Sequence, residues 1–150
     1  MKIDEIDIKI LSELQKDSRL SMRELSKRVN LSAPSVTERV NKMEDEGIIE
    51  GYSIKINRKK LGYSLTCLIE VTMRNGEYEK FRTSISKEPR CLFCYRVAGQ
   101  SCFILLLSVK TIEEIEEFIN SISSIAKTNT YITFSEIPIN RDIKDLLEEY

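Results

Sequence analysis

The chain has 150 residues, of which 41% are hydrophobic and 31% charged, and its formal net charge is −1. Such a composition is typical of a soluble globular protein with one or two domains, and it excludes a disordered chain. No apolar run approaches the ~20 residues of a membrane-spanning helix, and the charged start is unlike a signal peptide, so we expect a cytoplasmic protein without membrane contact.

Three amphipathic helices are predicted in the first 50 residues. The first begins after the capping residue Asp4, and its apolar residues recur at helical spacing: Ile6, Ile10, Leu11 and Leu14. The second begins at an S-x-x-E capping box formed by Ser21 and Glu24, and it ends by Asn30. We expect both helices to turn these apolar faces inward.

The third helix is predicted to run from the capping residue Ser32 to Gly47, a residue suited to a left-handed stop. Pro34 lies in its first turn, where a missing N–H costs nothing. Its inward stripe is narrow and consists of Val36, Val40 and Met43. Two short helices joined by a tight turn, with another helix packed across them, form a helix-turn-helix.

The outward face of the third helix is polar. In a helix-turn-helix the N-terminal part of this helix enters the major groove, so the candidates for base contacts are Pro34, Ser35, Thr37, Glu38 and Asn41. The candidates for phosphate contacts, including the starts of two helices, are Arg19, Ser21, Arg23, Ser32, Arg39 and Lys42. A helical bundle of this size also serves as a protein-contact module, and the pattern alone leaves that alternative open.

Charge is distributed unevenly along the chain. Residues 16–42 contain seven basic and three acidic residues, whereas the part after Gly62 contains ten basic and thirteen acidic ones. A basic region on an otherwise acidic chain is compatible with a phosphate-binding surface and equally with a solvated one. After the helices, residues 52–56 alternate as a short strand and residues 57–64 are polar and basic. We therefore assign residues 1–50 to a helix-turn-helix domain and residues 51–64 to a hinge strand and linker.

The second half has the pattern of a ferredoxin-like βαββαβ domain over residues 65–138, which makes the whole chain an α+β protein. The predicted strands are 65–73, 91–99, 102–110 and 130–138. The predicted helices are 78–88 and 111–127. Residues 139–150 are expected to form an acidic C-terminal tail or short helix.

The chain has four cysteines and no histidine. Cys91 and Cys94 have the C-x-x-C spacing of some zinc and redox sites, but they lie in a β-rich run. Residues three apart on a strand point to opposite faces, so we interpret both as buried apolar side chains and predict neither a metal site nor a cofactor. A metabolic enzyme is disfavoured, because the chain lacks histidine, a glycine-rich phosphate loop and a clustered nucleophile and base.

Several motifs together resemble the Lrp/AsnC (leucine-responsive, feast/famine) family of transcriptional regulators, closest to its bacterial LrpC branch. They are D-x-x-D-x-x-I-L at 4–11, D-S-R-L-S-M-R-E-L at 17–25, S-x-x-S-V-x-x-R-V at 32–40 and G-I-I at 47–49. The resemblance covers residues 1 to about 138. It implies an N-terminal winged helix-turn-helix, a hinge strand and a C-terminal effector domain called RAM. Family members are homo-oligomers: they dimerise through the sheets of this domain, and the dimers assemble into octamers that bend or wrap double-stranded DNA.

The resemblance also places an amino-acid effector pocket at the turn between the second and third strands. There the family usually has G-x-x-D, and this chain has Gly99, Gln100, Ser101 and Cys102. A carboxylate suited to the ammonium group of an amino acid is missing at Cys102, so we expect a weak or absent response to common amino acids. A related alternative is an architectural DNA-binding protein with weak sequence preference and no effector.

Overall fold

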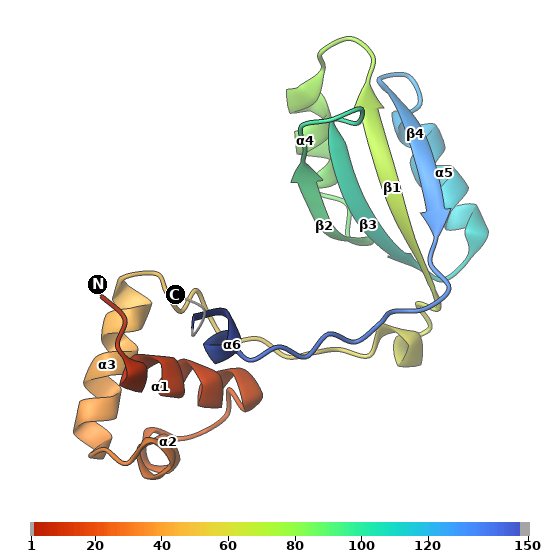
Figure 1. The fold of residues 1–150 in the computed structure, drawn as a ribbon. Coiled ribbons are helices and arrows are strands. Elements are labelled where there is room, and N and C mark those ends of the chain that lie inside the picture. The colour runs from red at the N-terminus through yellow and green to blue at the C-terminus, as the bar shows by residue number, and fades with distance from the viewer. Residues whose placement is uncertain (1, 148–150) are drawn as a thin grey trace. The chain divides into compact units, whose positions relative to one another are not determined.

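The computed structural model describes residues 2–147, and the chain forms two compact units, each considered by itself. The helical unit consists of Met1–Lys55 together with Pro138–Tyr150, and the sheet unit consists of Ile56–Ile137. Figure 1 labels the elements of each unit. None of the helices in the described part of the chain is long and apolar enough to cross a membrane.

The three helices predicted for the first 50 residues are confirmed as α1 (Glu5–Lys16), α2 (Met22–Val29) and α3 (Ala33–Asp45). Each helix begins at a side-chain cap expected from the sequence: Asp4, Ser21 and Ser32. The capping oxygens accept hydrogen bonds from backbone N–H groups that have no partner within the helix. The start of each helix is therefore set by one polar residue.

One apolar cluster holds the helical unit together. Its buried members come from all three helices, at positions predicted to face inward: Ile10, Leu14, Leu25, Val29, Val36, Val40 and Met43. The chain leaves α3 through Gly47, whose φ of 71° lies in the left-handed region that glycine adopts without strain. After it, the Tyr52 hydroxyl donates to a carboxylate oxygen of Glu44 at 2.8 Å.

The C-terminal segment packs on α1, as part of the helical unit. The Ser12 hydroxyl donates to a carboxylate oxygen of Asp142 at 2.6 Å. The side-chain amide of Gln15 donates to the carbonyl of Arg141 at 3.1 Å and accepts from the backbone N–H of Ile143 at 2.9 Å. A short helix, α6 (Ile143–Leu147), follows these contacts. Of the expected tail, residues 148–150 lie outside the described residues.

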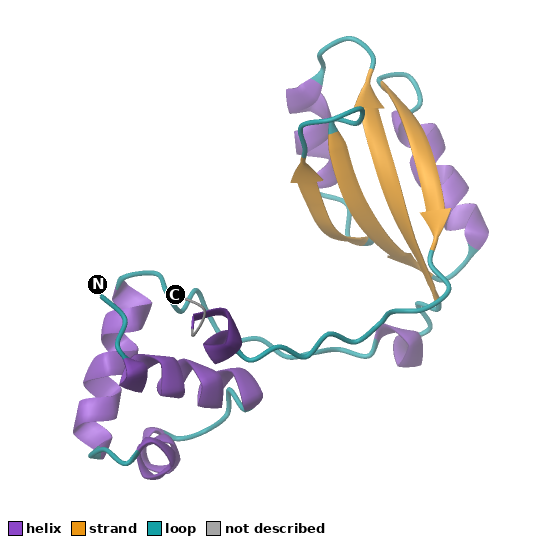
Figure 2. Ribbon diagram, viewed as in Figure 1, coloured by secondary structure: helices purple, strands orange, loops and turns teal. Residues whose placement is uncertain are grey.

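The predicted βαββαβ order is confirmed in the sheet unit (Figure 2). The strands are β1 (Leu65–Met73), β2 (Cys91–Arg96), β3 (Phe103–Val109) and β4 (Ala126–Ile132). The helices are α4 (Tyr78–Ile85) and α5 (Ile112–Ile122). All neighbouring strands are antiparallel, in the order β2-β3-β1-β4.

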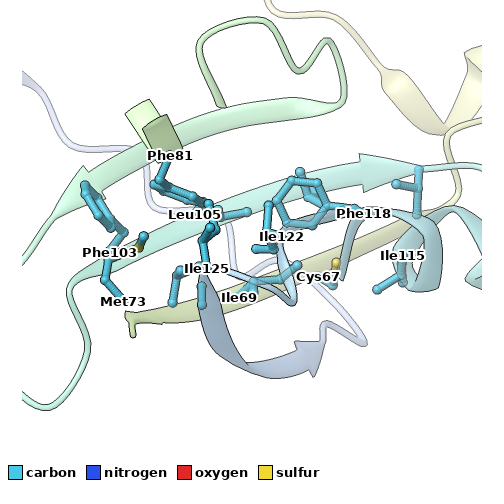
Figure 3. Close-up of a cluster of buried hydrophobic side chains, with 14 residues drawn as sticks. Cys67, Ile69, Met73, Phe81, Phe103, Leu105, Ile115, Phe118, Ile122 and Ile125 are labelled. Carbon is cyan, nitrogen blue, oxygen red and sulfur yellow. The ribbon is translucent and has the colours of Figure 1, made fainter. Parts of the chain in front are cut away.

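Both helices of the sheet unit cover the same face of the sheet. Alternate residues of β1 and β3, such as Ile69 and Leu105, are fully buried against Phe81 of α4 and Phe118 of α5 (Figure 3). Successive side chains of a strand point to opposite faces, so the remaining residues of these strands lie on a face that no helix covers. Within the described part of the sheet unit that face is open.

Arg90 ties the start of β2 to α5. Its guanidinium forms two hydrogen bonds with the carboxylate of Glu88, at 2.7 and 2.9 Å, and one with Glu117 at 2.9 Å. A bidentate arginine–carboxylate pair of this kind is stronger and more directional than a single hydrogen bond. The Arg90 guanidinium also holds the pKa of Glu88 below its ordinary value.

Two strand predictions were wrong. Residues 52–56 form no strand, because no other strand of the described chain lies beside them to complete a hydrogen-bonded ladder. Instead the chain reaches β1 through a short 3₁₀ helix, Arg58–Leu61. The last strand is Ala126–Ile132 rather than residues 130–138. It begins early because Ile125 and Ala126 pack into the core and α5 ends at Ile122, before the predicted residue 127.

The face prediction for the C-x-x-C pair was also wrong. A bulge interrupts β2 between Cys91 and Phe93, so Cys91 lies opposite Leu107 and Cys94 lies opposite Leu105. Those partners are two residues apart, which puts both cysteines on the same face, against the core. Burial raises the pKa of the Cys91 thiol to about 11 and also raises that of Cys94. Both are free thiols, and residues 2–147 contain no metal-binding cluster of acidic or cysteine side chains.

We predict that the folded protein loses stability below about pH 4.5. The pKa of Glu13 is lowered mainly by Arg28, that of Glu88 by Arg90, and that of Asp4 by the Asp7 backbone N–H, from ordinary values of 4.5, 4.5 and 3.8. Carboxyls with lowered folded-state pKa values contribute stability above those ordinary values and lose it as the pH falls further. Urea unfolding between pH 7 and pH 3 measures this, and Glu88→Gln should reduce the pH dependence. A stability that is constant to pH 3 would contradict the prediction.

Candidate nucleic-acid interface

The turn between α2 and α3 is short and rigid. It is closed by Asn30, whose φ of 57° is the only positive φ of a non-glycine residue in the described chain. The backbone N–H of Leu31 donates to the carbonyl of Ser26 at 3.1 Å, and Ser32 then caps α3. Asparagine tolerates this left-handed conformation better than most residues. The two helices of the motif are thus joined by only three residues.

α3 has one buried stripe and one outward polar face. Val36, Val40 and Met43 are at most 2% exposed and fasten the helix to the core. Of the predicted base-contact residues, Pro34, Glu38 and Asn41 are exposed. The chain therefore presents these three side chains on the side of α3 that faces away from the core.

The other two predicted base-contact residues are half-buried and have hydroxyls in local hydrogen bonds. The Thr37 hydroxyl donates to the carbonyl of Ala33 at 2.9 Å. The Ser35 hydroxyl lies 2.7 Å from that of Ser32. Thr37 therefore offers its methyl group more readily than its hydroxyl, as expected for a contact with thymine.

Most of the predicted phosphate-contact residues are exposed: Arg19, Ser21, Arg23, Ser32 and Lys42. Among the described residues no ion pair involves Arg19, Arg23 or Lys42, so their charges are not neutralised by neighbouring carboxylates. Ser21 and Ser32 lie at helix starts, where backbone N–H groups add positive potential.

Arg39 lies differently from the other five. Its Nη1 donates to Oδ2 of Asp4 at 2.8 Å and to Oδ1 of Asp7 at 2.7 Å, and its side chain is 31% exposed. These carboxylates raise the pKa of Arg39. The bond of Asp7 to α3 was not predicted from the sequence, although an acidic residue inside an apolar helix face signals such a partner.

The predicted effector turn carries a thiol in a polar setting. Cys102 Sγ accepts from the backbone N–H of Met73 at 3.4 Å and lies 3.5 Å from the hydroxyl of Tyr78. The bond with Tyr78, more than any other contact, lowers the pKa of the Cys102 thiol. The guanidinium of Arg96 lies 5.2 Å from the centre of the Tyr78 ring. Sequence reasoning missed Tyr78 and Arg96, which come from α4 and β2.

The open face of the sheet carries an apolar strip, beside which Glu70 lies opposite Asn129 and Thr72 opposite Lys127. Across its centre Leu68 lies opposite Leu106 on one side and Tyr131 on the other, and Phe93 lies opposite Leu106. Tyr131 is 52% exposed, and Leu68, Leu106 and Phe93 are half-buried. A contiguous apolar surface of this kind on a soluble domain marks an interaction site.

Comparisons with known proteins identify both halves of the chain. A family model for winged helix-turn-helix DNA-binding matches residues 3–50, and the model for the Lrp/AsnC ligand binding domain matches residues 66–143. The chain is 48% identical to the HTH-type transcriptional regulator LrpC of Bacillus subtilis over 137 residues, which cover 91% of this chain and 95% of LrpC. It is 34% identical to the leucine-responsive regulatory protein of Escherichia coli, and the match covers 90% of this chain and 87% of that protein.

Solved structures agree with these matches. The structure of Bacillus subtilis LrpC superposes with a TM-score of 0.91 at 47% identity, and the match covers 93% of this chain and 100% of LrpC. A transcriptional regulator of Neisseria meningitidis in complex with L-Met superposes with a TM-score of 0.87 at 27% identity. The match covers 94% of this chain and 96% of that regulator. The chain therefore belongs to the Lrp/AsnC family of transcriptional regulators.

Proposed function

We propose that this protein is a sequence-preferring DNA-binding transcriptional regulator that reads the major groove with the N-terminal half of α3. The observation that carries the proposal is the two-sided character of α3, with Val36, Val40 and Met43 in the core and polar residues facing out. The tight turn at Asn30 supports it, because it gives α2 and α3 the arrangement of a helix-turn-helix. We infer no catalytic activity and a cytoplasmic location.

Specific roles follow from the donor and acceptor pattern of the major groove. Glu38 accepts a hydrogen bond from a cytosine amino group, and Asn41 pairs with adenine. Pro34, Ser35 and the methyl group of Thr37 make close contacts with base edges. Arg19, Arg23 and Lys42 hold phosphates, together with the helix starts at Ser21 and Ser32.

We further propose that the protein acts as a homo-oligomer built on the open face of the sheet. Two such faces packed together would bury the apolar residues around Leu68 and Leu106 on both copies. A dimer presents two reading helices to successive major grooves, about 34 Å apart. Assembly of such dimers into an octamer would bend or wrap the DNA.

The ligand-binding half suggests modulation by a small molecule. The Neisseria meningitidis regulator was solved with L-Met. In this chain the turn at Gly99, Gln100 and Ser101 leads to a thiol at Cys102, so no carboxylate is offered to an ammonium group there. We therefore propose that free amino acids bind weakly or not at all.

We predict that substitutions at two neighbouring residues of α3 change different properties of DNA binding. Lys42→Gln should weaken binding to all DNA and reduce the slope of log affinity against log salt by about 0.9, the value for one phosphate contact. Asn41→Ala should leave that slope unchanged and cost about 1–3 kcal/mol at the preferred site only. Fluorescence anisotropy at several salt concentrations, with a selected site and with bulk DNA, measures both quantities. Unchanged site preference in Asn41→Ala and Glu38→Ala would instead favour the architectural alternative.

We predict that Cys102→Asp creates a response to amino acids that the natural protein lacks. The new carboxylate would accept a ligand's ammonium group, and ligand binding raises the unfolding temperature. A thermal-shift panel of free amino acids measures this, with Cys102→Ser as a variant of similar size and no charge. A shift of several degrees in the natural protein with sub-millimolar leucine would contradict the prediction.

We predict that Leu106→Lys converts the oligomer to monomers. The substitution places a charge at the centre of the open sheet face without touching the buried core. Sedimentation velocity measures the mass, and circular dichroism checks the fold. The control is Ile112→Lys, which changes a residue that is 58% exposed at the start of α5. Equal masses for the two variants would exclude this face as the interface.

A further inference from the structure

Arg39, Asp4 and Asp7 form a small charged cluster between α1 and α3, which we call the Asp4–Asp7–Arg39 cluster. We propose that this cluster is a positioning element that sets the orientation of α3 on DNA, and that Arg39 does not hold a phosphate. The inference rests on the proposed function and deepens it, because it assigns how the reading helix is held.

Asp7 is the centre of the cluster. It is 1% exposed, and among residues 2–147 it is the only acidic or basic side chain that is buried. Its Oδ1 accepts from Arg39 at 2.7 Å, and its Oδ2 accepts from the backbone N–H of Asp4 at 3.1 Å. A buried carboxylate needs such partners on both oxygens, because an unpaired buried charge is strongly destabilising. Asp7 therefore requires Arg39 at this position.

Asp4 adds a second constraint. Its Oδ1 caps α1 by accepting from the backbone N–H groups of Ile6 and Asp7, both at 2.9 Å. Its Oδ2 accepts from the same Nη1 of Arg39 at 2.8 Å. One guanidinium nitrogen of α3 is thus joined both to the first turn of α1 and to the cap that begins it.

These contacts are directional, whereas the contacts of α3 with the apolar core are not. Val36, Val40 and Met43 are held by apolar packing, which has no preferred direction. A shift of α3 by one residue would rotate it by about 100° and move it by about 1.5 Å. Either movement would break the bonds of Arg39 to Asp4 and Asp7. The cluster therefore fixes the rotation of the face that carries Glu38 and Asn41.

The charge of the cluster argues against a phosphate contact. Two carboxylates and one guanidinium give it a net charge of −1, which repels a phosphate. Lys42, one turn further along α3, has no carboxylate partner within residues 2–147. Two basic residues of one helix thus have different roles, and Lys42 serves as a matched control for Arg39.

The test compares four forms of the full chain: the natural protein, Arg39→Met, the double variant Asp7→Leu/Arg39→Met, and Lys42→Gln. DNA affinity is measured at several salt concentrations with a selected site and with bulk DNA, at a temperature where circular dichroism shows each form folded. Arg39→Met should lower the preference for the selected site about tenfold, the size of one lost base contact, and leave the salt slope unchanged. Lys42→Gln should reduce the slope by about 0.9 and leave the preference unchanged.

The double variant separates positioning from simple stabilisation. It replaces the buried ion pair by apolar side chains, so its unfolding temperature should recover relative to Arg39→Met, while its site preference should stay low. Recovery of the full site preference would show that the cluster only stabilises the bundle, and it would overturn the proposal. A slope reduced by about 0.9 in Arg39→Met would also overturn it, since Arg39 would then be a phosphate contact. If the natural protein itself showed no site preference, the proposed function would fail as well.

Discussion

The helical unit depends on a single buried charge. Its apolar core has only seven buried side chains, contributed by three short helices. Packing of that kind excludes water and keeps one stripe of α3 inward, but it supplies no directional bond. The carboxylate of Asp7 adds such bonds, because both of its oxygens have fixed donors, one from α3 and one from the start of α1. The position of the outer face of α3 is therefore a consequence of electrostatics as much as of apolar burial.

The sheet unit shows the opposite arrangement, in which apolar burial is left incomplete. α4 and α5 cover one face of the sheet, and the helix-free face keeps a row of apolar side chains that crosses all four strands. The two units thus differ in what they leave exposed. One presents the polar face of α3, and the other presents an apolar strip that its own helices do not cover.

Local features made much of this structure predictable from the sequence. Asp4, Ser21 and Ser32 identified the helix starts, since a cap acts on residues only a few positions away. The order of strands and helices in the second half followed from hydrophobic periodicity for the same reason. The bulge in β2 escaped prediction, because it depends on the register with β3 and not on the sequence of β2 alone. The base and phosphate contacts stay predictions, and the partner of Arg39 was missed because it lies more than thirty residues away.

The return of the C-terminal segment to α1 has a topological consequence. The chain leaves the helical unit after Lys55 and re-enters it at Pro138, so the sheet unit is an insertion within the helical unit and not a domain that follows it. The chain passes between the units twice. After the second passage, Asp142 and Ile143 form hydrogen bonds with Ser12 and Gln15 of α1, the helix that also carries Asp7. The helical unit therefore needs both ends of the chain: removal of residues 138–147 would take away the partners of Ser12 and Gln15 on α1.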